Sequence, residues 1–472
     1  GRMQKMVESE QQHQRRPSLS QAVWALAFVI AVIVVGIRQK VGMTAPLAMG
    51  AMAAACVSLL LGSSWRSVQQ GIVQGISQSL VAVCIIILVG MLIGLWIVGG
   101  TVPTIIYYGL HLIYPEMFLP VTFVICCITS LATGTSFGTI GTVGLALMSI
   151  GLGLGVPSAM TAGAIASGAF FGDKMPPLSD TTNVAPAIAG TDLFKHIGSM
   201  LWTTLPAAVI SFGLYWFIGR DYGAGQVNWE TVNEIRSTLA GTFSLGAVTL
   251  IPAVLVILLS VFRLPALATL TLGICCSGLC AAFSQGLGFK ALLAASMHGY
   301  SSATGVAMVD KILSRGGIDM MSGTLIMLIG AMAMGGLLEQ SRVLSVIIEA
   351  LMRRVRGALG LILSTIAACY ATLGVTGNMM LAIILPGKTF KPVFDRMGIA
   401  PEVLSRTLED AGTLGSVLVP WGIPALFLMG ALSVDASFIP YVFLSLISPL
   451  FAILYAATGF AFRREAHVPS AD

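Results

Sequence analysis

The chain has 472 residues, of which 56% are hydrophobic and only 10% are charged. A soluble domain carries roughly 25% charged residues, so this composition excludes an ordinary soluble globular protein and indicates a membrane protein. The net charge of +5 is informative only loop by loop, because Lys and Arg positions set the orientation of membrane segments. Nothing in the sequence indicates a nucleic-acid partner or a tightly bound cofactor.

Apolar runs of spanning length recur along the whole chain. A helix that crosses the hydrocarbon core needs about 20 apolar residues. The first run, from Gln21, is too long for the core of a signal peptide and is therefore kept as a spanning helix. The predicted spans are 21–37, 43–61, 76–98, 197–219, 241–262, 264–283, 322–338 and 441–462. The lipid bilayer is the expected partner.

The sequence repeats itself. Residues 91–100 ("MLIGLWIVGG") and 327–336 ("MLIGAMAMGG") are identical at six of ten positions. An ordered series of matches follows, in which Thr133, Gly134, Pro157, Gly168 and Pro176 recur as Thr376, Gly377, Pro401, Gly412 and Pro420. Chance matches between apolar segments would not keep this order. We predict a tail at 1–20, a first repeat at 21–220, a linker at 221–240, a second repeat at 241–464 and a tail at 465–472.

The basic residues predict that the two halves are inverted. The loop 101–116 holds no Lys or Arg, whereas the equivalent loop 339–357 holds Arg342, Arg353, Arg354 and Arg356. Because basic loops lie on the cytoplasmic side, the two loops are expected on opposite sides of the membrane. The linker is then external, and both termini, with Arg15, Arg16, Arg463 and Arg464, are cytoplasmic.

Two segments are predicted to be re-entrant hairpins. Segment 358–387 has basic flanks at both ends, so it must enter and leave on the cytoplasmic side. Its repeat mate, 117–150, would enter from outside. The predicted fold is an all-α polytopic membrane protein with two inverted repeats, about ten transmembrane helices and two re-entrant hairpins. Lys290, Lys311 and Arg315 do not fit this scheme and require either an external loop or an additional pair of short helices.

Glycines and prolines interrupt both halves at matching positions. Gly134 and Gly377 lie at the expected hairpin tips, and Pro176-Pro177 and 420–424 interrupt the crossings that follow. Non-helical backbone at membrane depth survives only where it is buried in protein or lines a wet cavity. Any single one of these residues could be a packing contact or a kink. Breaks paired by an inverted repeat are typical of a secondary transporter with its site near the midplane.

Acidic residues accompany the breaks. Asp173 and Asp180 flank the first break, and Glu409 and Asp410 lie in the second interrupted crossing. An ionisable residue inside the membrane is by default a functional hypothesis. A buried carboxylate is neutralised by a proton or by a cation, so one site could exchange the two. The alternative is a structural ion pair, either Asp173 with Lys174 or Arg406 with Asp410.

Three strings, "GTSFGTIGTVG", "GAFFGDKMPPLSDTTNVAPAIAGTDLF" and "LSRTLEDAGTLGSVLVPW", resemble the NhaC-type sodium/proton antiporter family. The resemblance implies a bacterial inner-membrane carrier with alternating access, sodium and protons as its ions, and a homodimer. That family also includes exchangers of organic acids. The implied cation- and substrate-binding residues are Thr133, Gly134, Thr135, Ser136, Asp173, Asp180, Thr181, Thr182, Asn183, Thr376, Gly377, Asn378, Glu409, Asp410 and Thr413. For sodium itself we predict the set Thr135, Asp180, Asn378 and Asp410.

One segment departs from the family pattern. After "VPW", members of the family carry polar residues such as Asn-Thr, whereas this chain has Gly422, Ile423, Pro424 and Ala425. An apolar wall contributes nothing to a bare cation but favours a solute with an apolar part. The alternative function is therefore a sodium- or proton-coupled transporter of a small organic anion or amino acid.

An enzymatic function is a remote alternative. The string "GTSFG" at 134–138 matches G-x-S-x-G, the pattern around the nucleophile of many hydrolases. That pattern requires a strand, a sharp turn and a helix with histidine and acid partners, whereas here it lies in an apolar, glycine-rich segment. We predict a transporter and not an intramembrane hydrolase.

Overall fold

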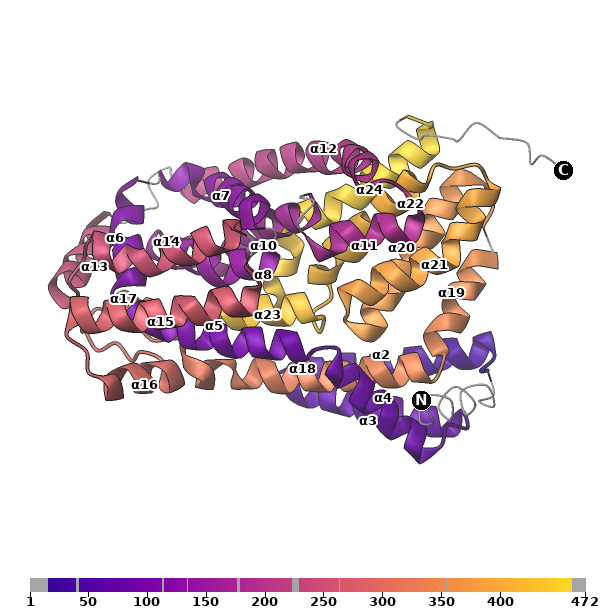
Figure 1. Ribbon diagram of the computed structural model, residues 1–472, viewed down its shortest axis with the longest axis horizontal. Helices are drawn as coiled ribbons and strands as arrows, with labels where there is room; N and C mark the ends of the chain where they lie inside the picture. Colours follow the sequence, from indigo (N-terminus) through magenta and orange to yellow (C-terminus); the bar gives the residue numbers. More distant parts are fainter. Residues whose placement is uncertain are drawn as a thin grey trace.

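The computed structural model describes residues 16–39, 42–112, 114–133, 135–175, 179–222, 229–262, 264–353 and 355–460. In these residues every regular element is a helix (Figure 1). The helices of the first half are α2 (Leu19–Arg38), α3 (Thr44–Leu60), α4 (Trp65–Ser77), α5 (Leu80–Val98), α6 (Thr101–Leu112), α7 (Phe118–Thr133), α8 (Ser136–Thr139), α9 (Leu145–Gly153), α10 (Ser158–Lys174), α11 (Asp180–Ala189) and α12 (Leu193–Gly219).

The helices of the second half begin with one that lies partly in the predicted linker. They are α13 (Trp229–Thr242), α14 (Ala247–Val261), α15 (Ala266–Gln285), α16 (Phe289–His298), α17 (Ala307–Leu313), α18 (Gly317–Gln340), α19 (Val343–Arg353), α20 (Gly357–Thr376), α21 (Met379–Arg396), α22 (Pro401–Leu408), α23 (Ile423–Leu432) and α24 (Phe443–Thr458). Two π-helical turns, η2 (Ile140–Gly144) and η4 (Glu409–Thr413), lie in the interrupted parts of the two halves.

The protein is an all-helical membrane protein. Within the described ranges, eight helices are long and apolar enough to cross a membrane, or up to ten if each of two bent pairs counts as one span. Each predicted apolar run coincides with a helix, namely α2, α3, α5, α12, α14, α15, α18 and α24. The arms of the predicted hairpins also reach spanning length in α7, α8 to α9, and α20. Whether they re-enter on one side stays a prediction.

Both predicted breaks in the crossings are present. Helix α10 ends at Lys174 and α11 begins at Asp180, while Pro176 and Pro177 lie outside the described residues. In the second half, Pro401–Leu418 and Ile423–Leu432 meet at a bend of 43°. The predicted linker contains most of helix α13, which bends by 99° into α14. Lys290 and Lys311 lie on the short helices α16 and α17, which is the additional helix pair considered above.

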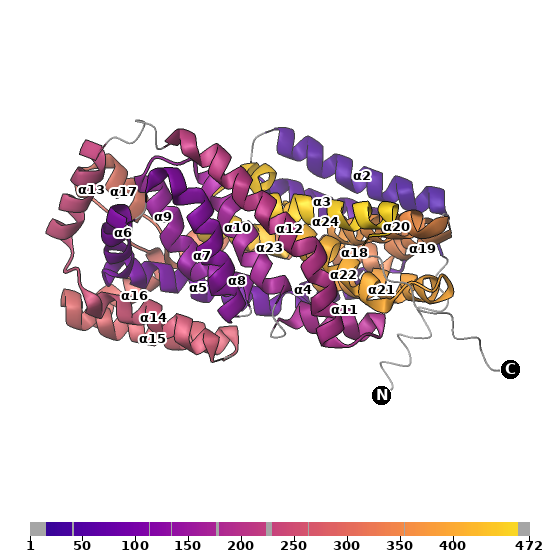
Figure 2. The same cartoon turned by 90° about the horizontal axis from the view of Figure 1, so that it is seen from above.

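The two halves exchange equivalent contacts. Helices α3 and α4 pack against α18 of the second half, and α15 and α16 pack against α5 of the first half. Figure 2 shows α2 at one edge of the molecule, where it packs against α3 and α19. The interrupted elements α8, α10, α11 and α23 gather in the middle (Figure 1). The exact limits of the two repeats stay a prediction.

Glycines allow the halves to approach this closely. A Cβ atom on Gly75 of α4 would lie 2.1 Å from the carbonyl oxygen of Met332, and one on Gly336 of α18 would lie 2.1 Å from that of Gly71. In a membrane, helices associate through van der Waals packing and not through the hydrophobic effect, and small residues at the crossings allow their backbones to approach closely. At this crossing, the glycines therefore let the backbones of the two halves come into direct contact.

Candidate ion and solute site

A cavity of about 1000 Å³ lies where the two halves meet. One side is formed by α5 and α15, and the other by the tips of the two interrupted segments in each half. Its polar lining comes from Gln78, Thr133, Thr135, Asp173, Ser179, Thr181, Thr269 and Asn378. Carboxylate, hydroxyl and amide oxygens are the ligands that hard cations prefer. Much of the remaining wall is apolar.

Asp173 is the described carboxylate that borders this cavity. It lies in the last turn of α10 and is 6% exposed. The Ser136 hydroxyl donates to its Oδ2 at 2.7 Å, and the Ser179 hydroxyl donates to its Oδ1 at 2.9 Å. Ser136 begins α8 and Ser179 immediately precedes α11, so the ends of three helices converge on this one carboxylate.

The hydroxyls of the threonines after the break donate hydrogen bonds to backbone carbonyls at the end of α10. The Thr182 hydroxyl donates to the carbonyl of Lys174 at 2.8 Å, and the Thr181 hydroxyl donates to that of Asp173 at 3.4 Å. The last carbonyls of a helix have no partner within the helix. Asn183 likewise donates from its amide to the carbonyl of Ser179 at 2.8 Å. These contacts hold the interruption in one conformation.

The second hairpin tip has its own anchors. Gly377 follows α20 with a φ of +61°, a left-handed conformation that favours glycine. Asn378 caps α21, since its Oδ1 accepts from the backbone N–H of Met380 at 2.9 Å. Its amide nitrogen then faces Gln78 Oε1 at 3.3 Å. The N–H of Ile423 donates to the carbonyl of Gly377 at 3.0 Å, which joins the tip to α23.

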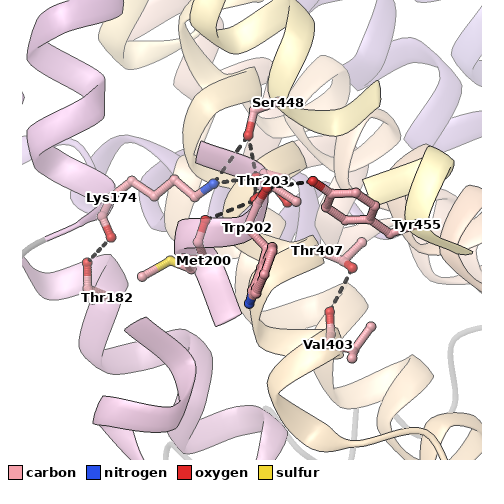
Figure 3. A network of polar contacts seen from close by, with 10 residues as sticks. Lys174, Thr182, Met200, Trp202, Thr203, Val403, Thr407, Ser448 and Tyr455 are labelled. Carbon is pink, nitrogen blue, oxygen red and sulfur yellow. Dashed lines mark hydrogen bonds and ion pairs between the residues drawn. The ribbon is translucent and has the colours of Figure 1, made fainter. Parts of the chain in front are cut away.

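Behind the cavity, Lys174 and Asp410 form an ion pair between the two halves, and both side chains are 0% exposed. The Asp410 Oδ1 atom also accepts from the Thr203 hydroxyl at 3.0 Å and the Ser448 hydroxyl at 2.5 Å. Figure 3 shows Lys174 extending toward Ser448, and Thr203 lying beside them. Helices α10, α12 and α24 thus each contribute a donor to one carboxylate oxygen. Lys174 therefore pairs with Asp410 of the other half, not with its neighbour Asp173 as considered from sequence, while Arg406 of the same half as Asp410 also acts on that carboxylate.

The family model described as the Na+/H+ antiporter family matches residues 168–460, which include both breaks and all four acids. The chain belongs to the Na+/H+ antiporter family. This membership confirms the NhaC-type resemblance and a transporter in place of a hydrolase. Within this antiporter family, known relatives differ in what they carry.

Three relatives illustrate the range. The Na(+)/H(+) antiporter NhaC of Alkalihalophilus pseudofirmus is 36% identical over 89% of this chain and 91% of the relative. The malate-2H(+)/Na(+)-lactate antiporter of Bacillus subtilis is 37% identical over 85% and 86%. The arginine/ornithine antiporter ArcD of Halobacterium salinarum is 34% identical over 94% and 93%. Similarity of this degree therefore shows that the chain is a membrane antiporter but does not identify the solute that it carries.

The structure of this antiporter-family chain brings only part of the predicted set to the cavity. Thr135 and Asn378 of the predicted sodium group both line it, but Asp410 lies behind it and the side chain of Asp180 is outside the described part. Gly134 also falls outside the described residues. Thr376 bonds to its own helix at the carbonyl of Thr372. The members that line the cavity are Thr133, Thr135, Asp173, Thr181 and Asn378.

Sequence reasoning missed Thr203 and Ser448 as partners of Asp410, and Gln78 as part of the cavity wall. Thr203 and Ser448 lie inside apolar runs, where a hydroxyl usually bonds to the carbonyl one turn earlier. No local pattern separates such a hydroxyl from one that faces a distant acid. Gln78 carried a weak signal, because it is a polar residue at the start of a long apolar run.

Proposed function

We propose that this chain is a secondary antiporter that exchanges sodium ions for protons by alternating access, with Asp173 as the carboxylate that meets the cation. The observation that carries this proposal is the position of Asp173 on the wall of the cavity, among the hydroxyls of Ser136, Ser179 and Thr181. Each of these hydroxyls keeps oxygen lone pairs that could coordinate a cation. The negative charge of a buried acidic site is compensated either by a cation or by a proton, so sodium binding at Asp173 and protonation of the site exclude each other.

The predicted topology indicates to which side of the membrane the cavity opens. With the linker outside, α5 and α15 both begin at the cytoplasmic side. The cavity is bordered by Gln78, just before α5, and by Pro265, just before α15. The position of both residues supports a state that is open to the cytoplasm. We further propose a homodimer in a bacterial inner membrane with cytoplasmic termini, which the family resemblance and the basic loops support.

A small organic anion or amino acid is the second candidate solute. Ligand cavities commonly measure about 300–1000 Å³, far more than a bare ion requires. Ile423 and Pro424, from the segment that departs from the family pattern, border this cavity, whereas Ala425 is buried and does not. An apolar wall favours a solute with an apolar part at roughly 25 cal/mol per Å² of covered surface. The relatives that exchange organic solutes support the same candidate.

Transport by purified protein in liposomes tests the function. An acid interior should drive uptake of radioactive sodium by the wild type, and Asp173→Asn should reduce uptake to the level of empty liposomes. Asp192→Asn is the matched control, because it makes the same change at an exposed N-cap position where Asn caps equally well. Absence of sodium uptake, with sodium-dependent thermal stabilisation by an organic acid or amino acid, would replace the proposal with the second candidate.

A further inference from the structure

Glu409 is a buried acid that the sodium site at Asp173 does not use. It begins the π-helical turn η4, immediately before Asp410, and is 0% exposed. Among the described residues, neither of its carboxylate oxygens has a hydrogen-bond partner. The hydroxyl of Thr413, at the other end of the same turn, acts on Glu409 as a donor but forms no hydrogen bond of ordinary geometry with it. Asp410, its neighbour, is bonded to Lys174, Thr203 and Ser448 through Oδ1.

Two adjacent acids therefore have opposite environments. An ionised carboxylate needs donors or a counter-ion when it is removed from water, and without them it takes up a proton instead. Asp410 has a counter-ion and two hydroxyl donors. Among the described residues, Glu409 has no counter-ion of its own, and its one nearby donor, the Thr413 hydroxyl, forms no hydrogen bond of ordinary geometry, so this arrangement suits a neutral carboxylic acid. When different environments push the pKa values of two acids apart, one acid carries the proton and the other stays ionised.

The surrounding ionisable groups act on Glu409 in both directions: Lys174 favours its ionised form, whereas Asp173 and Asp410 favour its neutral form. Asp173 and Lys174 of α10 and Asp410 of its own turn act on Glu409. Lys174 is engaged with Asp410, so two carboxylates and one engaged lysine face this acid. Arg406 of α22, Tyr370 of α20 and Tyr455 of α24 act on Asp410 from the other packed helices. A positive charge added near Asp173 would change this balance in favour of an ionised Glu409.

The local backbone is also unusual. A π-helical turn inserts an extra residue, is rare, and occurs frequently at functional sites. Here the turn covers Glu409–Thr413, the part of the second crossing that packs against α10. It places Glu409 and Asp410 in different surroundings although they are consecutive in sequence. The turn thus separates an acid without an aligned hydrogen-bond partner from an ion-paired one.

We propose that Glu409 carries the transported proton while Asp173 binds the cation, an assignment that deepens the proposed function and rests on it. When sodium enters the oxygens around Asp173, the O–H bond of Glu409 breaks and the proton leaves to water. The sodium charge then compensates the new carboxylate. When sodium leaves on the other side, a proton from that side binds Glu409 again. One sodium ion is exchanged for one proton, and coupling acts through charge rather than through a shared ligand.

Two transport modes separate this role from a structural one. In liposomes, wild type should take up radioactive sodium driven either by an acid interior or by unlabelled internal sodium without a pH gradient. Glu409→Gln mimics the neutral acid in shape and charge. We expect the variant to keep sodium/sodium exchange near the wild-type rate and to lose uptake driven by the pH gradient.

Other variants serve as references. Asp173→Asn should lose both modes, because the cation would lose its carboxylate. Glu402→Gln makes the same change at a residue of α22 that is 8% exposed and lies outside the proposed exchange; it should keep both modes. A second measurement uses purified protein in weak buffer. Adding sodium chloride should release protons from wild type and from Glu402→Gln, but not from Glu409→Gln.

The outcomes are decisive in each direction. Uptake driven by the pH gradient in Glu409→Gln, or proton release equal to that of wild type, overturns the assignment. Loss of both modes in a Glu409→Gln protein with an unchanged melting temperature also overturns it, because Glu409 would then be needed for the cation itself. A wild-type protein that performs neither sodium mode rejects the proposed function, and the role of Glu409 with it.

Discussion

At Asp410, one carboxylate oxygen receives Lys174 and two hydroxyls, from helices that the sequence separates widely. Taking both charges out of water is expensive, and the ion pair only compensates for that cost. Removing one partner leaves the other charge buried and unmatched. The pair is therefore best understood as a link between the halves, which holds α10, and with it Asp173 at the cavity wall, against the second half.

The first prediction concerns this pair. Lys174→Met should lower the free energy of unfolding by about 3–5 kcal/mol, because Asp410 would lose the counter-ion that is bonded to it. The double variant Lys174→Met and Asp410→Leu should recover most of that loss, because neither charge of the pair stays buried. Thermal unfolding in detergent measures both. If the double variant is as unstable as Lys174→Met, packing rather than charge accounts for the effect.

At the residue scale, the sequence predicted the acids better than their partners. Asp173 and Asp410 were recognisable because a charge in an apolar segment is costly and rarely accidental. The partner of Lys174 was not, because its neighbour Asp173 was the nearer choice and Asp410 is 236 residues away. Such a contact depends on how two helices approach, which local sequence does not encode.

At the scale of elements, the cavity ends at an aromatic contact between the halves. Phe137 of α8 borders the cavity and packs on Phe427 of α23, with ring centroids 4.8 Å apart. Along α5 the cavity reaches Ile85, and the next residue on that face, Val89, is buried. A Cβ atom on Gly141 would lie 3.1 Å from Val89 and 3.6 Å from Phe427. These residues close the cavity at one end.

The second prediction is that this contact prevents leakage. Phe427→Ala removes a ring from a close-packed core, and such a change opens volume that neighbours only partly refill. We expect sodium to pass down its gradient without proton export, seen as sodium uptake that leaves the liposome interior without the alkalinisation that exchange by the wild type produces. Phe427→Leu, which keeps most of the volume, should remain tight. Equal coupling in wild type and Phe427→Ala would mean that the barrier lies elsewhere.

Element breaks were predictable in part. Proline and glycine interrupt helices by removing donors or relaxing the backbone, so the breaks near 176 and 420 and the turn at Gly377 could be inferred from sequence. The π-helical turns at 140–144 and 409–413 could not. They are formed by residues that also suit an ordinary helix, and the packing against neighbouring helices decides between the two forms.

At the scale of the whole molecule, the halves share elements and exchange contacts but not charges. Helix α18 receives α3 and α4, as α5 receives α15 and α16. The described acids at the cavity and behind it are not distributed equally between the halves: Asp173 lies in the first half, and Glu409 and Asp410 lie in the second. Alternating access needs two similar scaffolds, whereas coupling needs one set of charges. The packing of α3 and α4 on α18, and of α15 and α16 on α5, joins the two halves, and the sequence places the charges asymmetrically.

The last prediction concerns the orientation of these scaffolds. If the halves are inverted, α6 of the first half and the end of α19 in the second half lie on opposite sides, because basic residues stay in the cytoplasm. Tyr108 is 48% exposed on α6, and Arg353 is exposed at the end of α19. Tyr108→Cys should react with an impermeant thiol reagent only from outside, and Arg353→Cys only from the cytoplasm. The background must lack native cysteines, since Cys56, Cys84 and Cys275 are exposed. Labelling of both positions from the same side would contradict the inverted arrangement, and with it the cytoplasmic opening proposed for the cavity.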